Sequence, residues 1–163
     1  MAYNTIKVKK YTDVIEEFIA LAAIYPGMIV EMDSAGKAKV HATAGGNVVP
    51  IMVALEDELQ GKGIDDAYAA NDKVQVWIPN SGDQFYGIIA DGQTIAKGDL
   101  LESDGYGRLQ KHVPDEDSGG TGRPIMQSAI VGVALDAVST AAGSEDSDIN
   151  FLSIYRRIPV RVR

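Results

Sequence analysis

Apolar and polar residues alternate at both ends of the chain. Near the start, Ile6 and Val8 alternate with Lys7 and Lys9 within the segment Asn4 to Lys10. A period of two residues is typical of a strand that is buried on one face. We therefore expect this segment to form an extended arm.

The C-terminal tail alternates in the same way. Ile158, Val160 and Val162 fall on one face of an extended chain. The sequence thus predicts a terminal strand whose other face is basic, carrying Arg157, Arg161 and Arg163.

Residues 13–22 fit two structures. Asp13 and Glu16 have the spacing of a helix-capping pair, whereas the many β-branched residues of the segment favour a strand. The helical alternative would place these side chains on one face: Val14, Ile15, Phe18, Ile19 and Ala22. Both structures stay open, and we assign residues 1–22 to an N-terminal arm.

From Pro26 onward, turn residues and short apolar runs follow one another. Gly, Asn or Asp turns the backbone, and a strand-like run comes next, as in Asn71 to Val76 and Gly82 to Tyr86. This pattern is typical of short strands joined by tight turns.

An internal echo supports the β interpretation. The segment GMIVEMDSAGKAKVH, from Gly27 to His41, aligns without gaps with GDLLESDGYGRLQKH, from Gly98 to His112, roughly seventy positions later. A Pro-Ile-Met and a Val-Ala-Leu follow each copy: Pro50 to Met52 with Val53 to Leu55, and Pro124 to Met126 with Val133 to Leu135. Each copy predicts strand, tight turn, strand, loop and strand.

These patterns predict an all-β protein. We expect residues 23–163 to form a small β-barrel or β-tulip-like body from two related strand-turn-strand halves, because three short strands cannot bury a core alone. The small, acidic segments 115–122 and 141–148 are expected to be mobile loops.

Composition narrows the range of functions. The chain has 163 residues, no cysteine and a net charge of −8, so its field repels phosphate backbones and anionic membranes. Neither nucleic acid nor a membrane is an expected partner. Disulfides and thiolate metal sites are excluded.

One motif points to nucleotide chemistry. The run Gly63 to Tyr68, with Asp65 two residues after the glycine, is similar to the central motif of trimeric dUTP nucleotidohydrolases, in which the Asp prepares a water and the Tyr packs on deoxyribose. The phosphate-binding Arg and Ser motif and the Gly-rich C-terminal flap of those enzymes are missing. The same residues are equally suited to a turn and a buried tyrosine, and we expect no enzymatic activity.

Two further candidates are metal sites. His41 and His112 occupy matching positions of the echo, which would suit a pseudo-symmetric metal pair and is equally explained by duplication. The acidic run from Asp115 resembles a calcium loop, but Met126 stands where a bidentate Glu is required. We expect neither a metal nor a cofactor.

The chain resembles the small capsid decoration, or cement, proteins of tailed double-stranded-DNA bacteriophages. The resemblance runs from Ala23 to Val138 and is carried by AIYPGMIVEMDSAGKAKVHATAGG, by VALEDELQGKGIDDAYAANDKVQVWIPNSGDQFYGIIADGQTIAKGDLLESDGYGRLQKH and by VGVALDAV. It implies a β-barrel or β-tulip-like body without catalysis, bound where capsomers meet on the outside of the head, often as a trimer. The partners would be the major capsid protein and further copies of the chain.

The resemblance also implies an N-terminal arm that contacts the capsid. The arginine tail is added because basic strands at both ends would complement an acidic neighbour, although an ordinary solvated face explains it equally well. The expected location is the virion surface, with the host cytoplasm before assembly. The expected partner contacts are Tyr3, Asn4, Thr5, Ile6, Lys7, Val8, Lys9, Lys10, Arg157, Arg161 and Arg163.

A carbohydrate- or receptor-binding β-module on the virion surface is the main alternative. Such a module would display clustered aromatic side chains. The candidates in the middle of the chain are Tyr68, Trp77, Phe85, Tyr86 and Tyr106. Their alternation with apolar strand residues favours the core for most of them.

Overall fold

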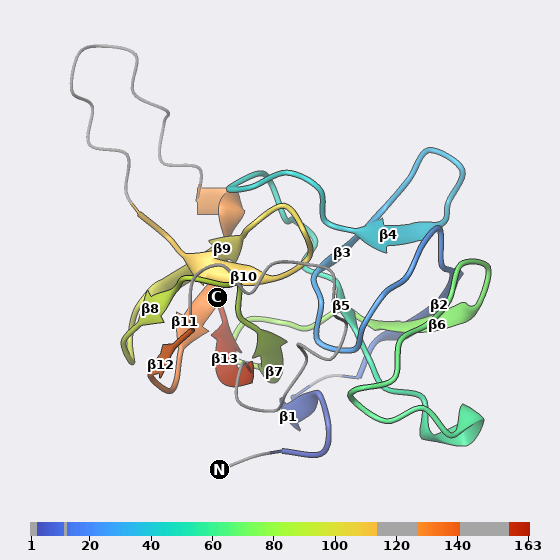
Figure 1. Cartoon of the computed structure of the whole chain (residues 1–163), viewed down its shortest axis with the longest axis horizontal. Helices are drawn as coiled ribbons and strands as arrows, with labels where there is room; N and C mark the ends of the chain where they lie inside the picture. Colours follow the sequence, from blue (N-terminus) through green and yellow to red (C-terminus); the bar gives the residue numbers. More distant parts are fainter. Residues whose placement is uncertain (1–2, 12, 114–126, 141–156) are drawn as a thin grey trace.

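The computed structural model describes residues 3–11, 13–113, 127–140 and 157–163. Figure 1 shows short strands joined by turns, with strands of the first half of the chain on the right and those of the second half on the left. The strands are β1 (Lys7–Lys9), β2 (Ile15–Ile19), β3 (Val30–Met32), β4 (Ala38–Val40), β5 (Val53–Ala54), β6 (Lys73–Trp77), β7 (Gln84–Ile88), β8 (Thr94–Ile95), β9 (Leu100–Ser103), β10 (Leu109–Lys111), β11 (Ile130–Ala134), β12 (Val138–Ser139) and β13 (Arg157–Val162). Two single 3-10 turns, Glu58–Gln60 and Gln127–Ala129, accompany them.

All the named strands pair in antiparallel fashion. The largest sheet has the order β1-β7-β13-β11-β9-β10, and a smaller one has the order β2-β6-β5. The hairpin β3-β4 and the pair β8-β12 complete the described sheets. The predicted all-β class is therefore confirmed, and no closed barrel forms among the described residues.

Residues 15–19, for which helix and strand both stayed open, form β2. This strand pairs along its whole length with β6, from Ile15 opposite Trp77 to Ile19 opposite Lys73. Side chains on β2 are mostly exposed, and only the next residue, Ala20, is fully buried. The predicted loops at 115–122 and 141–148 lie outside the described residues.

The internal echo is a structural repeat. The hairpins β3-β4 and β9-β10 share one register, since Glu31 faces Lys39 in the first and Glu102 faces Gln110 in the second. The backbone N–H at the start of each copy donates to the third strand, from Gly27 to Ala54 O and from Gly98 to Ala134 O, both at 2.8 Å. The predicted arrangement of two related halves is thus observed.

Each hairpin turns on an aspartate. The Oδ1 atom of Asp33 accepts the backbone N–H groups two and four residues later, both at 2.8 Å, and Oδ1 of Asp104 does the same at 2.8 and 3.0 Å. Gly36 and Gly107 complete the turns with φ of 76° and 75°, which only glycine adopts without strain. The local sequence Asp-x-x-Gly therefore encodes the same turn twice.

The repeat extends beyond the segment that the sequence revealed. Strand β2 pairs with β6 as β7 pairs with β13, and a parallel bridge ends each outer strand, Ala20 with Ala38 and Ile89 with Leu109. Each half therefore runs β2-β6-β5-β3-β4 or β7-β13-β11-β9-β10. Its first and last strands meet at that bridge, so each half is an open, barrel-like unit.

Two hydrophobic clusters fill these units. The smaller one lies in the first half and contains Ile24, Met52, Tyr68, Val74 and Val76 among others. The larger one fills the second half and continues into the contact between the halves through Ile29, Val53, Leu55 and Trp77. Burial of this shared cluster fixes the two halves against each other.

Candidate partner-contact surface

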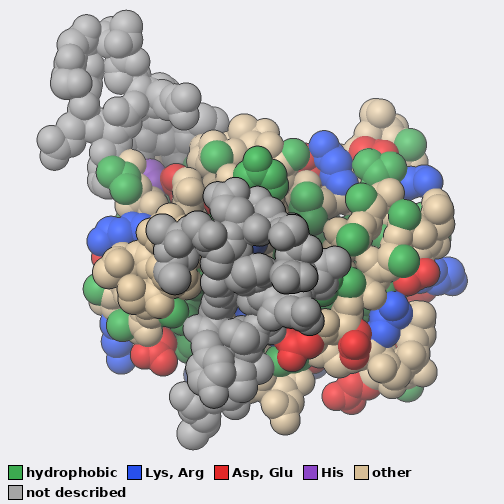
Figure 2. All heavy atoms as spheres, in the orientation of Figure 1, with side chains coloured by type: hydrophobic (Ala, Val, Ile, Leu, Met, Phe, Trp, Pro, Cys, Tyr) green, Lys and Arg blue, Asp and Glu red, His purple; other side chains and the backbone are tan. Residues whose placement is uncertain are grey.

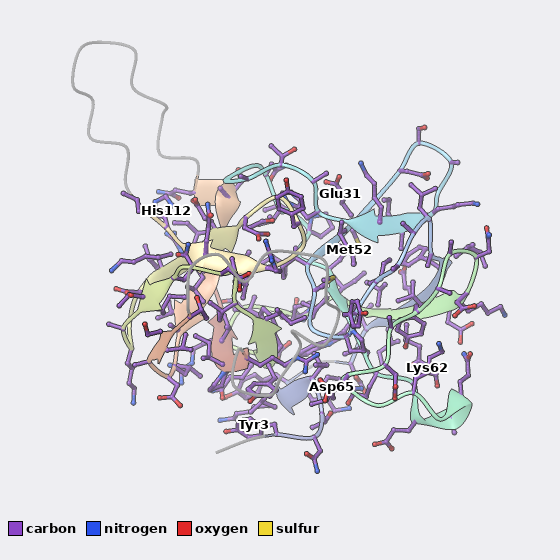
Figure 3. The ribbon with its side chains drawn as sticks, in the orientation of Figure 1. Tyr3, Glu31, Met52, Lys62, Asp65 and His112 are labelled. Carbon is purple, nitrogen blue, oxygen red and sulfur yellow. The ribbon has the colours of Figure 1, made fainter. Side chains whose placement is uncertain are left out.

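The N-terminal segment lies against the body of the protein. Ile6 is completely buried in the larger cluster, and its carbonyl accepts the N–H of Tyr86 at 2.8 Å. The Glu56 carboxylate accepts the Ile6 N–H at 3.1 and 3.2 Å and the Thr5 hydroxyl. Tyr3 packs edge-on against Tyr86, with ring centroids 5.3 Å apart, and Figure 3 shows it beside β1.

The rest of the segment divides between the core and the surface. Val8 packs against the larger cluster, whereas Asn4, Lys9 and Lys10 are exposed. Lys7 and Lys10 both bond to Asp13, and the hydrogen bond from Lys10 is the main cause that lowers the pKa of this carboxyl. Lys9 is exposed, and its ammonium lies 5.3 Å from the centroid of the Tyr11 ring.

The predicted basic side of the C-terminal strand is split by the fold. The Arg157 side chain is buried, and its guanidinium donates to the Asp65 carboxylate, to Pro26 O at 3.1 Å and to Ile64 O. These partners all come from the first half of the chain. Arg157 therefore joins the two halves and is not on the surface, in contrast to Arg161 and Arg163, which are exposed.

The two ends of the chain meet on one face of the six-stranded sheet. Lys9 lies opposite Gln84 on β7, and Gln84 lies opposite Arg161 on β13. The register of β1 on β7 shifts between Lys7 and Lys9, which leaves Lys9 opposite Gln84. Directly opposite residues point to the same face, so Lys9 and Arg161 are about 10 Å apart, two strand spacings. Arg163, two residues further along, points the same way. We call Lys9, Arg161 and Arg163 the basic strip.

A buried aspartate holds the ends of this strip together. Asp83 is fully buried and accepts the backbone N–H of Tyr11 at 2.6 Å and that of Asn80 at 2.8 Å. Its backbone carbonyl accepts the N–H of Val162 at 2.8 Å. Sequence reasoning identified a turn at this position but missed the link, because the partners come from both ends of the chain.

The dUTPase-like motif is engaged within the chain. The Asp65 carboxylate bonds to Arg157, and Asp66 accepts the N–H of Gly63 at 2.8 Å. Tyr68 is fully buried, and its hydroxyl donates to Leu55 O at 2.8 Å. Its ring face is therefore not open for stacking on a sugar.

The two histidines lie in different surroundings. His41 is buried, with Nδ1 2.9 Å from the hydroxyl of the fully buried Ser103 and Nε2 3.0 Å from Asn47 O. His112 is half-buried, and its Nδ1 lies 2.6 Å from Glu102, the neighbour of Ser103 on β9. No group of three or more metal-binding side chains is found among the described residues.

Most aromatic candidates are in the core. Tyr68, Trp77, Phe85 and Tyr86 are buried, as the alternation predicted, and Tyr106 is 67% exposed. Figure 2 shows basic, acidic and apolar side chains interspersed over the visible described surface, without a broad area of one kind. No helix in the described part of the chain has the length and apolar character to cross a membrane.

No protein-family model matches the chain, and no curated protein matches it.

Proposed function

We propose that the protein is a non-enzymatic decoration protein that binds the outer surface of a tailed-phage head at capsomer junctions and stabilises it. The main support for this proposal is the basic strip. Although the chain is acidic overall, cations from both of its ends share one exposed sheet face: Lys9, Arg161 and Arg163. Such a strip complements an acidic surface. The resemblance of the sequence to decoration proteins supplies the identity of the partner, the major capsid protein.

A cement protein makes the same contact at many identical sites on the head. When several copies are held together in an oligomer, their modest individual affinities combine into a high overall affinity. A homotrimer would supply that joining. In this proposal the protein is present in the host cytoplasm before assembly and on the virion afterwards, and it contacts neither nucleic acid nor membrane.

The test is binding to purified heads that lack the protein, measured by co-sedimentation at low and high salt. Combined Lys9→Gln, Arg161→Gln and Arg163→Gln should weaken binding about tenfold at low salt and flatten its salt dependence, because exposed charges are screened by salt. The matched control is Lys37→Gln, Lys39→Gln and Lys73→Gln, which changes the net charge equally at sites in the first half.

Arg157 is left unchanged in this experiment because it is part of the core. Binding by the strip variant equal to that of the unmodified protein at both salt concentrations would remove the strip from the interface. Absence of binding by the unmodified protein would overturn the proposed function itself.

A further inference from the structure

The outer strands of the two halves, β2 and β7, are equivalent but differently covered. Strand β7 carries β1 on its outer edge, where Lys7 lies opposite Phe85. Val76 and Val160 are equivalent, because they lie opposite Ala54 and Ala134 of the repeated Val-Ala-Leu. Glu16 lies opposite Val76 and Phe85 lies opposite Val160, so Glu16 is the β2 residue at the position of Phe85. Within the described residues, no strand pairs with the corresponding edge of β2.

The backbone of β2 is oriented to accept a strand there. At the ends of the β2-β6 ladder, Ala20 donates to Asp72 O at 2.8 Å and Ile78 donates to Val14 O at 2.9 Å. Alternate residues bond in an antiparallel ladder, so the even-numbered residues of β2 bond β6. The N–H and C=O groups of Ile15, Glu17 and Ile19 consequently point to the outer edge.

The second half shows how such an edge is used. Tyr86, the equivalent of Glu17, donates its outward N–H to the Ile6 carbonyl of β1. In the first half no strand of the described residues pairs with this edge, and Leu21, just past β2, donates its N–H to Ala38 O at 2.8 Å. The open stretch is therefore one short strand long.

The side chains along this edge define what would fit it. Ile15 and Ile19 are 37% and 36% exposed on the face that also carries Glu17. On the other face, Glu16 and Phe18 line an open groove of about 530 Å³ together with Glu31 and Met52, the last two of which Figure 3 shows on neighbouring segments. An unpaired strand edge is a pairing site, and the two glutamates of β2 favour a partner strand that carries cations.

We propose that the outer edge of β2 binds, by strand addition, an extended segment of another protein in which apolar and basic residues alternate. In the register seen at β7, a lysine of the added strand lies opposite Glu16, and an apolar residue lies opposite Glu17, diagonal to Ile15 and Ile19. Opposite charges across a strand pair stabilise it, and apolar diagonal neighbours add packing. The inference does not rest on the proposed capsid role.

Charge argues against a second copy of β2 as the occupant. Two-fold pairing of this strand with itself, centred on Glu17, would place the two Glu17 carboxylates directly opposite each other. It would also place the Glu16 side chains of the two copies at diagonal positions on the other face. Like charges across a strand pair destabilise it. A basic strand removes this repulsion.

The test uses a fluorescent peptide with the sequence YNTIKVKKY, which corresponds to Tyr3–Tyr11, and measures anisotropy with the full-length protein. The Lys peptide should bind, and the charge-reversed peptide YNTIEVEEY should bind about tenfold more weakly. Glu16→Lys should reverse this preference. Such an exchange of specificity cannot come from loss of folding.

Glu17→Pro tests the edge itself, because proline removes an N–H that points outward and leaves the β6 ladder intact. It should reduce binding of the Lys peptide on the order of tenfold, with circular dichroism and thermal unfolding as folding controls. The proposal is overturned if the peptide does not bind, or if neither variant alters its binding. It is also overturned if sedimentation shows a dimer of the unmodified protein that Glu17→Pro dissociates.

Discussion

The turns of the two equivalent hairpins have the same internal geometry and opposite surroundings. Around Gly36, in the β3-β4 turn, a side chain would meet nothing within 4 Å. In the β9-β10 turn, Gly107 packs into the first half, where Ile29 donates its N–H to the Gly107 carbonyl at 2.8 Å. An Asp-x-x-Gly sequence thus specifies the turn, while the neighbouring half decides whether that turn is a surface loop or part of the core.

The interiors of the two halves differ in the sizes of the residues on neighbouring strands, and a larger residue on one strand is compensated by a smaller one on the other. Phe18 in the first half packs against the cluster that contains Ala38, and at the equivalent positions the second half has Gly87 and Leu109. A Cβ on Gly87 would lie 2.6 Å from the Leu109 side chain. A large residue on one strand is thus matched by a small one on the neighbouring strand, which keeps the volume filled.

The largest difference in the free energy of unfolding is expected between a substitution in β1, which covers the edge of β7, and one at the equivalent edge of β2. Ile6→Ala should lower the free energy of unfolding by about 3 to 4 kcal/mol, because it leaves a cavity where a fully buried side chain lay. Ile15→Ala, at the partly exposed edge of β2, should cost less than about 1 kcal/mol. Urea unfolding followed by circular dichroism measures both values, and equal losses would mean that β1 does not stabilise the second half.

The two turn glycines provide a closer comparison. Gly36→Ala and Gly107→Ala both force a positive φ on alanine, which costs about 1 kcal/mol. At Gly107 the added Cβ would also lie 3.0 Å from Ile29 O and 3.1 Å from the Val40 Cβ, so we expect a total loss of about 2 to 3 kcal/mol. Thermal unfolding of the two variants gives the difference directly, and similar melting temperatures would contradict the packing of this turn between the halves.

The smallest effect concerns Tyr68, which bridges to Ile24 in the first half as Val138 pairs with Ile95 in the second. Burial, aided by the charges of Asp57 and Glu56, raises the pKa of the Tyr68 phenol above its ordinary value of 10.0. The unfolded chain loses this proton first, so the stability contributed by the neutral phenol is complete below about pH 10 and is lost as pH rises through the folded pKa.

Tyr68→Phe should cost about 1 kcal/mol at pH 8, because Leu55 O loses its hydrogen bond. It should also make stability fall less steeply above pH 10. Urea unfolding at pH 8 and at pH 10.5 measures both effects. Burial also raises the pKa of Tyr25 and Tyr86, so part of the alkaline loss remains in the variant, but an unchanged slope would contradict the assignment to Tyr68.

The candidate site was only partly predictable from the sequence. Alternation in the tail placed Arg157 and Arg161 on one face, and they do point the same way from β13. One end of that face is covered by the first half, which buries Arg157 against Asp65 and Ile64, and the other end stays open at Arg161. Periodicity describes a strand and its two faces, but contains no information about which neighbour covers them.

By itself the sequence determined the all-β class, the repeated hairpin and the burial of most aromatic residues. These features depend on contacts within a few residues, such as an Asp side chain bonded two and four positions ahead, or on a period of two. Only the tertiary structure decided that β2 and β7 are equivalent, that β1 covers one of them, and that Lys9 and Arg161 share a face. Those relations join residues far apart in the chain, and they are set by the free energy of burying surface between the two halves, which no local pattern records.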